Sequence, residues 1–360
     1  NDTVYQYTVS FSEESTYGAS GSSSPITVTG LTNGTSYTFN VWAINAFGYS
    51  APSDASGSVS PVEPDYTQRG LFAIGYYFGY RNTIDYVDLS SAGNTSDFGD
   101  LTVTGDGGGA VASTTRAVFG GRYNGSLQNT IDYVTIASIG NATDFGDMVT
   151  SKRRYSACST SVYGLFIGGR TTTQISSVDY ITIATTGNSA SFGNLRTGRQ
   201  STGGSASNST RGIVGGGYDG SISTDTNEIE YTTISSSGSF SDFGDLTEAR
   251  QCIGTSSDTR ALFIAGYSNP LTSYRATIDY ITIASTGNAT VFGDQSSAGN
   301  RSMATSNKTV AVFNVSNGGT YTNTLEQVTI ATTGNSTDFG DLSVTSSAGY
   351  ATSGSHGGLS

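Results

Sequence analysis

The feature that most constrains this chain is an internal repeat of about 48 residues. The stretch "NTIDYVTIASIGNATDFGDMVTS" at 129–151 returns as "SSVDYITIATTGNSASFGNLRTG" at 176–198 and as "NTLEQVTIATTGNSTDFGDLSVT" at 323–345. The Phe of its "FG(D/N)" motif lies at positions 98, 145, 192, 243, 292 and 339, at intervals of 47 to 51 residues. Six copies with this period predict a propeller, a solenoid or an array of packed repeats.

Each copy reads as four short strands. A hydrophobic run ending in glycine, such as "GLFIGGR", is followed by a linker of variable length and a strand of the "TIDYVTIAS" type. A Gly-Asn pair then predicts a two-residue hairpin turn, because both residues tolerate positive φ. The short strand "DFGDL" comes next, and a Ser/Thr/Ala-rich strand comes last. Four antiparallel strands per repeat make one propeller blade, and small side chains suit its crowded innermost strand.

The predicted fold is therefore all-β, with a six-bladed β-propeller over residues 65–360. The composition agrees, since 48 Gly, many Ser, Thr, Asn and Tyr and only 12% charged residues suit short strands and tight turns. We expect the C-terminal strand, at about 346–355, to close the first blade by pairing with residues 71–75. That closure removes the unpaired edges that an open array would expose.

Residues 1–64 belong to a different, non-repeated region. The runs "VYQYTVSFS", "PITVTGL" and "SYTFNVWAINAFG" alternate between apolar and polar residues, as strands do. The segment "ITVTGLTNGTSYTFNVWAINAFGYSAPSDASGSVSP" resembles the second half of a fibronectin type III domain. The resemblance implies that residues 1–64 are the C-terminal part of such a β-sandwich, that Asn1 lies inside the domain, and that the domain serves as a spacer or binding module.

The repeats carry a second resemblance. Their glycine-ended strands, as in "FIGGR" (166–170) and "VFGGR" (118–122), are similar to kelch-type propeller repeats, although the usual kelch Trp is missing. Over residues 69–360 the phrase "GLFxGGY…NTIDYVTIASTGNATDFGDLT" more closely resembles repeats of tail-fibre and other virion proteins of marine, largely cyanobacterial, bacteriophages. This resemblance implies a structural protein of the virion, or a secreted or cell-surface protein, that contacts a host surface.

The composition excludes several classes of partner. The formal charge of -12 and the pI of about 4.4 repel nucleic acid. No apolar run approaches the ~18 residues of a membrane span, so we expect no membrane insertion. Cys158 and Cys252 lie more than ninety residues apart and form no CxxC pair, and they are predicted to be buried without a disulfide or zinc role.

Catalysis and metal binding find little support in the sequence. The acids of the "IDY" position and of "FGD" recur singly, without the dense spacing of a calcium loop, and are predicted to cap turns and bond backbone. His356 is the only histidine, which excludes a two-histidine copper site, and no "GxSxG" elbow accompanies it. Paired carboxylates for glycoside hydrolysis stay open, but every prominent acid is a copy within a repeat. We therefore predict no enzyme and no cofactor.

The informative variation lies in the linkers between the glycine-ended strand and the "IDY" strand. These loops are predicted to share one face with the connections between blades, while the opposite face carries the uniform "TGN" turns. Tyr-rich loops on a rigid scaffold are typical of binding surfaces. The candidate ligand-binding residues are Tyr76, Tyr77, Tyr80, Tyr123, Tyr218, Tyr267, Tyr274, Tyr321, Arg153 and Arg154, with Lys152 completing a local basic spot.

Three hypotheses for function follow. The first is a virion structural protein, a fibre or appendage, that presents the variable loops to a host surface glycan or protein. The second is a capsid or tail decoration protein with a purely architectural role. The third is an extracellular glycan-active enzyme or a bacterial adhesin. The expected partners are other virion proteins and further copies of the chain within a larger assembly.

Overall fold

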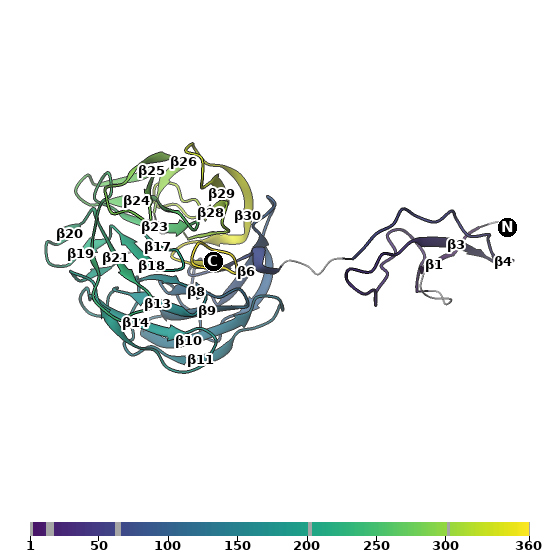
Figure 1. Cartoon of the computed structure of the whole chain (residues 1–360), viewed down its shortest axis with the longest axis horizontal. Helices are drawn as coiled ribbons and strands as arrows, with labels where there is room; N and C mark the ends of the chain where they lie inside the picture. The colour runs from purple at the N-terminus through teal and green to yellow at the C-terminus, as the bar shows by residue number, and fades with distance from the viewer. Residues whose placement is uncertain (1–2, 12–17, 62–65, 201–203, 301–302, 360) are drawn as a thin grey trace. The chain divides into compact units, whose positions relative to one another are not determined.

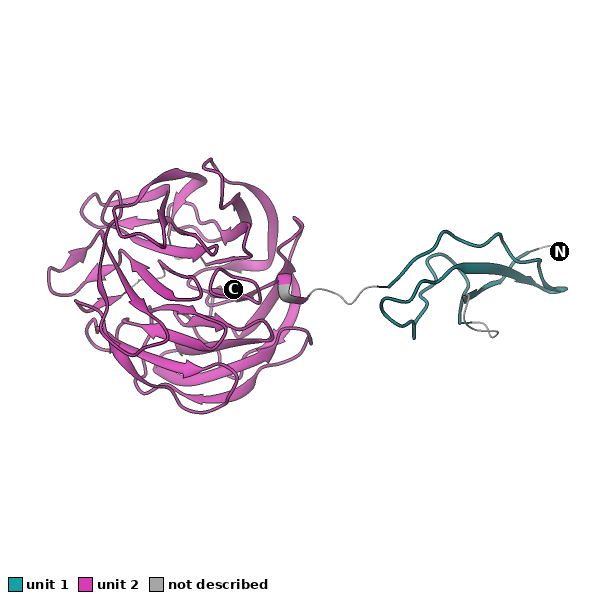
Figure 2. Ribbon diagram, in the orientation of Figure 1, with its two compact units in different colours: residues 1–65 teal, residues 66–360 magenta. Residues whose placement is uncertain are grey.

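The computed structural model describes residues 3–11, 18–61, 66–200, 204–300 and 303–359. Contacts divide the chain into two compact units, Asn1–Asp65 and Tyr66–Ser360 (Figure 2). The division falls one residue beyond the boundary expected from the sequence. Within the described ranges, strands dominate and the one helical element is the 3-10 turn η1 (Tyr66–Gln68), so the prediction of an all-β chain is confirmed.

Unit 1 contains one antiparallel sheet of four strands in the order β2-β1-β3-β4. Its strands are β1 (Gln6–Phe11), β2 (Ala19–Gly21), β3 (Phe39–Asn45) and β4 (Gly48–Tyr49). Beside the sheet, Tyr37 pairs with Val59 through an isolated bridge. Tyr37 is only 3% exposed, and its hydroxyl oxygen accepts the backbone N–H of Thr32 at 3.0 Å, which ties the chain before β3 to the sheet.

Unit 2 contains six four-stranded antiparallel sheets, here called sheets 1 to 6. Each sheet takes three strands from one repeat and its inner, Ser/Thr/Ala-rich strand from the end of the repeat before it; sheet 1 takes its inner strand from the last repeat. In order from inner to outer strand they are sheet 1, β31 (Tyr350–Ser353), β5 (Arg69–Ala73), β6 (Thr83–Asp88) and β7 (Ser96–Asp100); sheet 2, β8 (Gly109–Ala112), β9 (Arg116–Tyr123), β10 (Leu127–Thr135) and β11 (Thr143–Asp147); sheet 3, β12 (Ser156–Ser159), β13 (Tyr163–Ile167), β14 (Ser177–Thr182) and β15 (Ala190–Asn194); sheet 4, β17 (Ser205–Ser207), β18 (Arg211–Gly215), β21 (Glu228–Thr233) and β22 (Ser241–Asp245); sheet 5, β23 (Gln251–Ser256), β24 (Arg260–Ser268), β25 (Ser273–Thr282) and β26 (Thr290–Gly299); and sheet 6, β27 (Ala304–Ser306), β28 (Val310–Asn314), β29 (Thr322–Thr329) and β30 (Thr337–Ser346). A further small sheet joins β16 (Arg199–Gln200), β19 (Tyr218–Asp219) and β20 (Thr224–Asp225) beside sheet 4.

The inner strands contact one another in a cycle. β8 packs against β12, β12 against β17, β17 against β23, β23 against β27, β27 against β31, and β31 against β8. Figure 1 shows the sheets following one another in chain order around the C-terminus, from blue through teal and green to yellow. The expected pairing of the C-terminal strand with the first strand of the repeats is confirmed, because Tyr350 of β31 lies opposite Ala73 of β5.

The outer strand of every sheet carries a β-bulge at the "FG" motif. In sheet 2, Gly146 lies opposite Ile131 while Asp144 lies opposite Asp132, so Phe145 is the extra residue of β11. The same register shift occurs in the other five sheets. A bulge of this kind needs a residue of unusual backbone conformation, and Gly146 has φ 145°. The bulge turns the Phe ring away from solvent, and Phe145 is 2% exposed.

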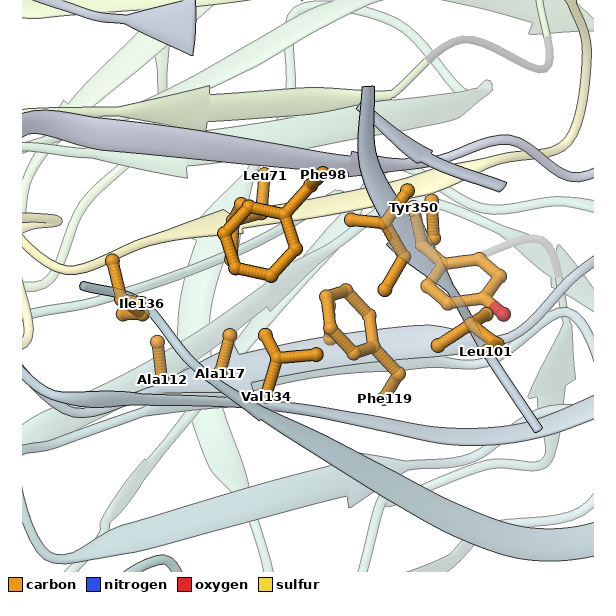
Figure 3. Close-up of a cluster of buried hydrophobic side chains, with 12 residues drawn as sticks. Leu71, Phe98, Leu101, Ala112, Ala117, Phe119, Val134, Ile136 and Tyr350 are labelled. Atoms are coloured by element: carbon orange, nitrogen blue, oxygen red, sulfur yellow. The ribbon is translucent and has the colours of Figure 1, made fainter. Parts of the chain in front are cut away.

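The hydrophobic core lies between successive sheets, as predicted for the repeated Phe. Phe145 belongs to a cluster that combines Val118 and Ile131 of sheet 2 with Phe166 and Ile181 of sheet 3. Figure 3 shows the equivalent cluster between sheets 1 and 2, where Leu71, Phe98 and Tyr350 face Ala117, Phe119 and Val134. Each core therefore needs side chains from two neighbouring repeats, which explains why the repeats are near-copies of one another.

The prediction of a two-residue hairpin at the Gly-Asn pair is wrong. Seven residues separate β10 from β11, and the chain turns early in this segment, where the N–H of Ser138 bonds to the carbonyl of Thr135. Gly140 and Asn141 instead reach sheet 1, where the Gly140 N–H bonds to the carbonyl of Phe98 and Asn141 Oδ1 accepts the N–H of Asp100. The recurring Gly-Asn pair therefore forms a contact between neighbouring sheets and not the hairpin turn.

Serine hydroxyls link the ends of the inner strands in one direction. Ser159 Oγ donates to the carbonyl of Ala112, Ser207 to Ser159, Ser256 to Ser207, Ser306 to Ser256 and Ser353 to Ser306. The sixth position is Ala112, which has no hydroxyl. His356, from the segment after β31, places Nε2 there, 3.2 Å from the Ala112 carbonyl oxygen and 3.1 Å from Ser159 Oγ.

Candidate functional site

The variable linkers and the connections between sheets lie together on one side of unit 2, here called the loop face. Three backbone bridges join the two kinds of segment: Tyr76 with Ser347, Asp106 with Tyr123, and Arg153 with Arg170. The short strands β16 and β19 join them in the same way at sheet 4. The uniform turns after the third strands lie at the other ends of those strands, and therefore on the opposite face.

Four of the candidate residues form a cluster on the loop face, here called the tyrosine–arginine cluster. The rings of Tyr76 and Tyr80 meet edge to face with centroids 5.5 Å apart, and Tyr80 meets Tyr123 in the same way at 6.0 Å. The Arg153 guanidinium lies 3.9 Å from the centroid of the Tyr123 ring. Desolvation and the nearby Asp106 carboxylate raise the pKa of Tyr80, which therefore keeps its proton at neutral pH. These rings come from repeats 1 and 2 and the arginine from the following connection.

A cavity of about 390 Å³ opens near the centre of the loop face, here called the central cavity. Three of the predicted residues line it, namely Arg154, Tyr267 and Tyr274. The two tyrosines are neighbours on β24 and β25, with ring centroids 5.1 Å apart. Their backbones lie in register, and the adjacent Gly319 approaches the Tyr274 hydroxyl so closely that a side chain there would collide with it.

Polar side chains that the sequence analysis did not select complete the wall of the central cavity. They are Asp106, Gln251, Asn269 and Asn300. Gln251 and Asn269 are held by Asp225, a buried carboxylate that is 2% exposed. Asp225 Oδ1 accepts Gln251 Nε2 at 2.9 Å and Asn269 Nδ2 at 2.8 Å, and Oδ2 accepts the Asn269 backbone N–H at 2.6 Å. No sequence motif marks this arrangement, because its members come from β20, β23 and the loop after β24.

Left-handed backbone recurs where the connections reach the central cavity. Gly107, Arg154 and Ala348 occupy the same position of the repeat, nine residues after the "FG" Phe, and have φ 64°, 54° and 50°. Their backbones are joined in series, since the Arg154 N–H bonds to the Gly107 carbonyl and the Gly107 N–H to the Ala348 carbonyl. Arg153 and Arg154 therefore point to different places, one to the tyrosine–arginine cluster and the other to the central cavity.

The remaining candidate tyrosines lie apart from these two groups. The Tyr77 ring packs on Phe78 at 4.7 Å, and Arg81 approaches it at 6.0 Å. Tyr218 belongs to the small sheet beside sheet 4, where it pairs with Gln200. Tyr321 directly precedes β29 and is partly buried. The structure thus brings seven of the ten candidates into the tyrosine–arginine cluster and the central cavity: Tyr76, Tyr80, Tyr123 and Arg153, and Arg154, Tyr267 and Tyr274.

Lys152 is not part of a surface basic spot. Its side chain is fully buried, and Nζ lies 3.2 Å from Asp179 Oδ2 and 3.0 Å from the carbonyl oxygen of Phe166. Burial lowers its pKa, and the Asp179 carboxylate opposes that effect. The sequence could not separate it from Arg153 and Arg154, because only the bend of the connection decides which of three adjacent cations turns inward.

The "IDY" acids do not lie in turns, and that part of the prediction is wrong. They lie within the third strand of each sheet and are at most 4% exposed: Asp85, Asp132, Asp179, Glu230, Asp279 and Glu326. Four of them pair with a buried cation, Arg122 with Asp132, Lys152 with Asp179, Arg199 with Glu230 and Arg250 with Asp279. Most also accept a backbone N–H from the preceding sheet, as Asp279 does from Thr247 at 3.0 Å. Their expected role in bonding backbone is therefore seen, but between sheets.

His356 lies where the inner channel narrows, away from the central cavity. Two smaller cavities of about 80 and 50 Å³ continue from the central cavity along the inner strands, and His356 lines the second. Its Nδ1 accepts the Gly358 N–H at 3.1 Å, which places the ring proton on Nε2. Burial lowers its pKa to about 4. In the part of the chain that the structure describes, no carboxylate hydrogen-bonds to this ring, so it has no acid to orient it as a catalytic base.

Both cysteines are buried and free, as expected. Burial raises the pKa of the Cys158 thiol to about 12 and that of Cys252 to about 11, which makes both poor nucleophiles. Over the described residues, no group of three or more His, Cys, Asp or Glu side chains is placed to hold a metal ion. The same residues contain no helix long and apolar enough to cross a membrane.

Comparison with known proteins identifies no relative. No protein-family model matches the sequence, and no curated protein matches it significantly.

Proposed function

We propose that unit 2 is a closed six-bladed β-propeller, in which sheets 1 to 6 are the blades. The cyclic contacts of the inner strands support this architecture. So does the repetition of one contact around the unit. A Cβ added at the bulge glycine of each sheet would meet the glycine carbonyl of the next repeat, in the pairs Gly99 with Gly140, Gly146 with Gly187, Gly193 with Gly238, Gly244 with Gly287, Gly293 with Gly334, and Gly340 with Gly93. The last pair joins the final repeat to the first.

For unit 1 we propose a fibronectin type III-like fold. The strand order β2-β1-β3-β4 matches the C-F-G sheet of immunoglobulin-like sandwiches with one further strand beside C. The buried Tyr37, bonded to the backbone of Thr32 five residues upstream, has the geometry of the tyrosine corner of that architecture. Such a module fits the role of a spacer within a longer, extended protein.

For the whole chain we propose a structural protein of a bacteriophage virion, a tail fibre or appendage, that binds a host surface through the loop face. One observation carries this proposal: the non-repeated residues gather their aromatic rings and cations on a single face, in the tyrosine–arginine cluster and around the central cavity. Rigid aromatic side chains give a large contact area at low entropic cost, and scaffold loops are where binding residues concentrate.

Binding of the fluorescently labelled full chain to marine cyanobacterial cells tests this proposal. We expect saturable binding that falls at least roughly tenfold in Tyr80→Ala and Arg153→Ala, because each removes an anchor of about 1.4 kcal/mol or more. Ile139→Ser is the matched control, since Ile139 is 57% exposed on the opposite face. Cell binding that Ile139→Ser abolishes and the loop-face variants leave unchanged would contradict the proposal, and no cell binding at all would favour a decoration protein.

A further inference from the structure

The central cavity has the chemistry of a site for one particular class of ligand. We propose that it binds the terminal unit of a neutral, hydroxyl-rich sugar chain. This inference rests on the proposed function and names the substrate class of the loop face. It depends on four features of the cavity: its size and closed inner end, its hydrogen-bond acceptors, its aromatic wall and its balanced charge.

The size of the cavity fits one or two sugar rings and not a protein surface. Its volume of about 390 Å³ lies at the lower end of the range of small-molecule sites. Toward the interior it narrows to cavities of about 80 and 50 Å³, enough for water only. At the smaller of these cavities His356 hydrogen-bonds to Ser159 and to the Ala112 carbonyl, and the Gly357 N–H bonds to the Ser256 carbonyl, so this segment is held against the inner strands. A chain that enters from the loop face must therefore end inside.

The acceptors of the cavity are held in place by a carboxylate that has no other evident role. Asp225 is buried, and in the described part of the chain no lysine or arginine pairs with it. Its oxygens instead take the side-chain N–H groups of Gln251 and Asn269. Because those amide nitrogens face Asp225, the amide oxygens Oε1 and Oδ1 face the other way, and both residues line the cavity. A buried carboxylate is costly unless it is fully hydrogen-bonded, and here its bonds fix two acceptors beside a cavity.

Tyr267 and Tyr274 supply the aromatic wall. Both are partly buried, with ring planes 63° apart, so they present a face and an edge at the same side of the cavity. The C–H groups of a sugar ring are apolar and weakly positive, and they pack on the electron-rich face of an aromatic ring. Two aromatic rings beside the neutral amides of the wall suit a ligand with both apolar and polar surfaces.

The charge of the wall argues against an ionic ligand. One cation, Arg154, and one anion, Asp106, line the cavity. The amide groups of Gln251, Asn269 and Asn300 are neutral, and the chain as a whole carries a formal charge of -12. An anionic ligand would meet Asp106 and the net charge, and a cationic ligand would meet Arg154. A neutral polyol can donate to the amide oxygens of the wall and brings no charge of its own to either group.

Saturation-transfer NMR of the full chain tests this proposal with four probes, the methyl glycosides of glucose, galactose, mannose and N-acetylglucosamine. At roughly 10 mM probe, a site with a Kd of about 1 mM is nearly full, so at least one probe should show transfer. We expect Tyr274→Ala and Gln251→Ala to weaken the affinity for that probe roughly tenfold, as the loss of one stacked or hydrogen-bonded contact does, and a titration of the transfer against probe concentration measures this affinity. Tyr274→Phe, which keeps the ring and risks no cavity, should retain most of it. Tyr80→Ala, outside the cavity, should leave it unchanged.

The outcomes separate this inference from the proposed function. No transfer from any of the four probes, or an affinity that Tyr274→Ala and Gln251→Ala leave unchanged in the folded chain, overturns the sugar site. Cell binding that depends on Tyr80 and Arg153 would then still support host recognition through the loop face. Conversely, sugar binding that requires Tyr274, in a chain that binds no cell, would support the site and contradict host recognition. Inorganic phosphate serves as the anionic probe, and phosphate that displaces the glycosides would show an anion site instead.

Discussion

The backbone N–H of Asp341 donates a 3.0 Å hydrogen bond to Oδ1 of Asn94, 247 residues earlier in the chain. The same bond joins Asp100 to Asn141, Asp147 to Asn188, Asp245 to Asn288 and Asp294 to Asn335. The first and last repeats therefore meet through the contact that joins neighbouring repeats elsewhere. Between sheets 3 and 4 the repeat has Ser239 in place of this Asn. The bond that remains there, from the Phe240 N–H to the Asn194 carbonyl, recurs at the other junctions, as from Ala142 to Asp100.

Substitution of the bulge phenylalanine tests the packing between sheets. We expect Phe145→Ala to lower the free energy of unfolding by about 3–5 kcal/mol, because a buried ring is lost and the sheets on both sides cannot collapse into the gap. Urea denaturation measures the change. Phe78→Ala is the control, since Phe78 is 89% exposed and should change stability by no more than about 0.5 kcal/mol. Equal losses in the two variants would show that Phe145 is not a core residue.

Two glycines with nearly the same backbone conformation test the close approach of neighbouring repeats. Gly146 has φ 145° and Gly187 has φ 154°, so alanine is strained at both. A Cβ on Gly146 would lie 2.5 Å from the Gly187 carbonyl oxygen, whereas a Cβ on Gly187 would meet nothing within 4 Å. We expect Gly146→Ala to be less stable than Gly187→Ala by about 1–3 kcal/mol, the usual cost of overpacking. Thermal unfolding measures the difference, and equal melting temperatures would argue against the contact.

The buried pair of Lys152 and Asp179 should show strong coupling. Lys152→Met leaves the Asp179 carboxylate buried without its cation, and we expect it to cost about 3–5 kcal/mol of unfolding free energy. The double variant Lys152→Met with Asp179→Asn removes the uncompensated charge and should recover part of that loss. A double-mutant cycle in urea measures the coupling energy. Purely additive effects would mean that the two groups do not interact in solution.

Stability should depend on pH through His356. Burial lowers the pKa of this ring from 6.5 to about 4, so the folded chain favours the neutral imidazole. The stabilisation is fully present above pH 6.5 and is lost as the pH falls from 6.5 toward 4, because the unfolded chain takes up the proton first. Unfolding curves of the native chain and of His356→Gln across that window measure the effect. We expect the difference between the two to shrink as the solution becomes acidic, and a constant difference would exclude the titration.

The repeat period predicts much of unit 2, because it fixes which residue types recur at which place in each sheet. It predicts the four strands of each repeat, the packing of Phe145 and the pairing of Tyr350 with Ala73. It does not predict which groups meet between repeats. Asp132 takes its cation from position 122, ten residues before it, whereas Asp179 takes its cation from position 152, and only the folded connections decide between these sources.

Most residues of the central cavity could not be predicted from the sequence either. Tyr267 and Tyr274 are predicted as binding residues because tyrosines in variable loops are typical of binding surfaces. The sequence did not identify the polar group of Asp225, Gln251 and Asn269, because these residues have no regular spacing and amide side chains form no recognisable motif. Their arrangement depends on the small sheet of β16, β19 and β20, which among the described residues occurs beside sheet 4 only and therefore leaves no trace in the period.

Because the repeats are near-identical, the closing strand could in principle pair with the wrong repeat or with a second chain. The hydrogen bonds of the serine hydroxyls help to specify which repeat the closing strand pairs with. At five of the six inner strands a serine hydroxyl donates a hydrogen bond to a backbone carbonyl of the inner strand before it. Ala112, at the sixth, has no hydroxyl to donate. At this residue the His356 imidazole, from the segment after β31, hydrogen-bonds to the Ala112 carbonyl and to Ser159 Oγ. A closing strand that paired with another repeat would bring His356 to a strand with serine in place of Ala112, so this contact distinguishes the native pairing from a shifted one.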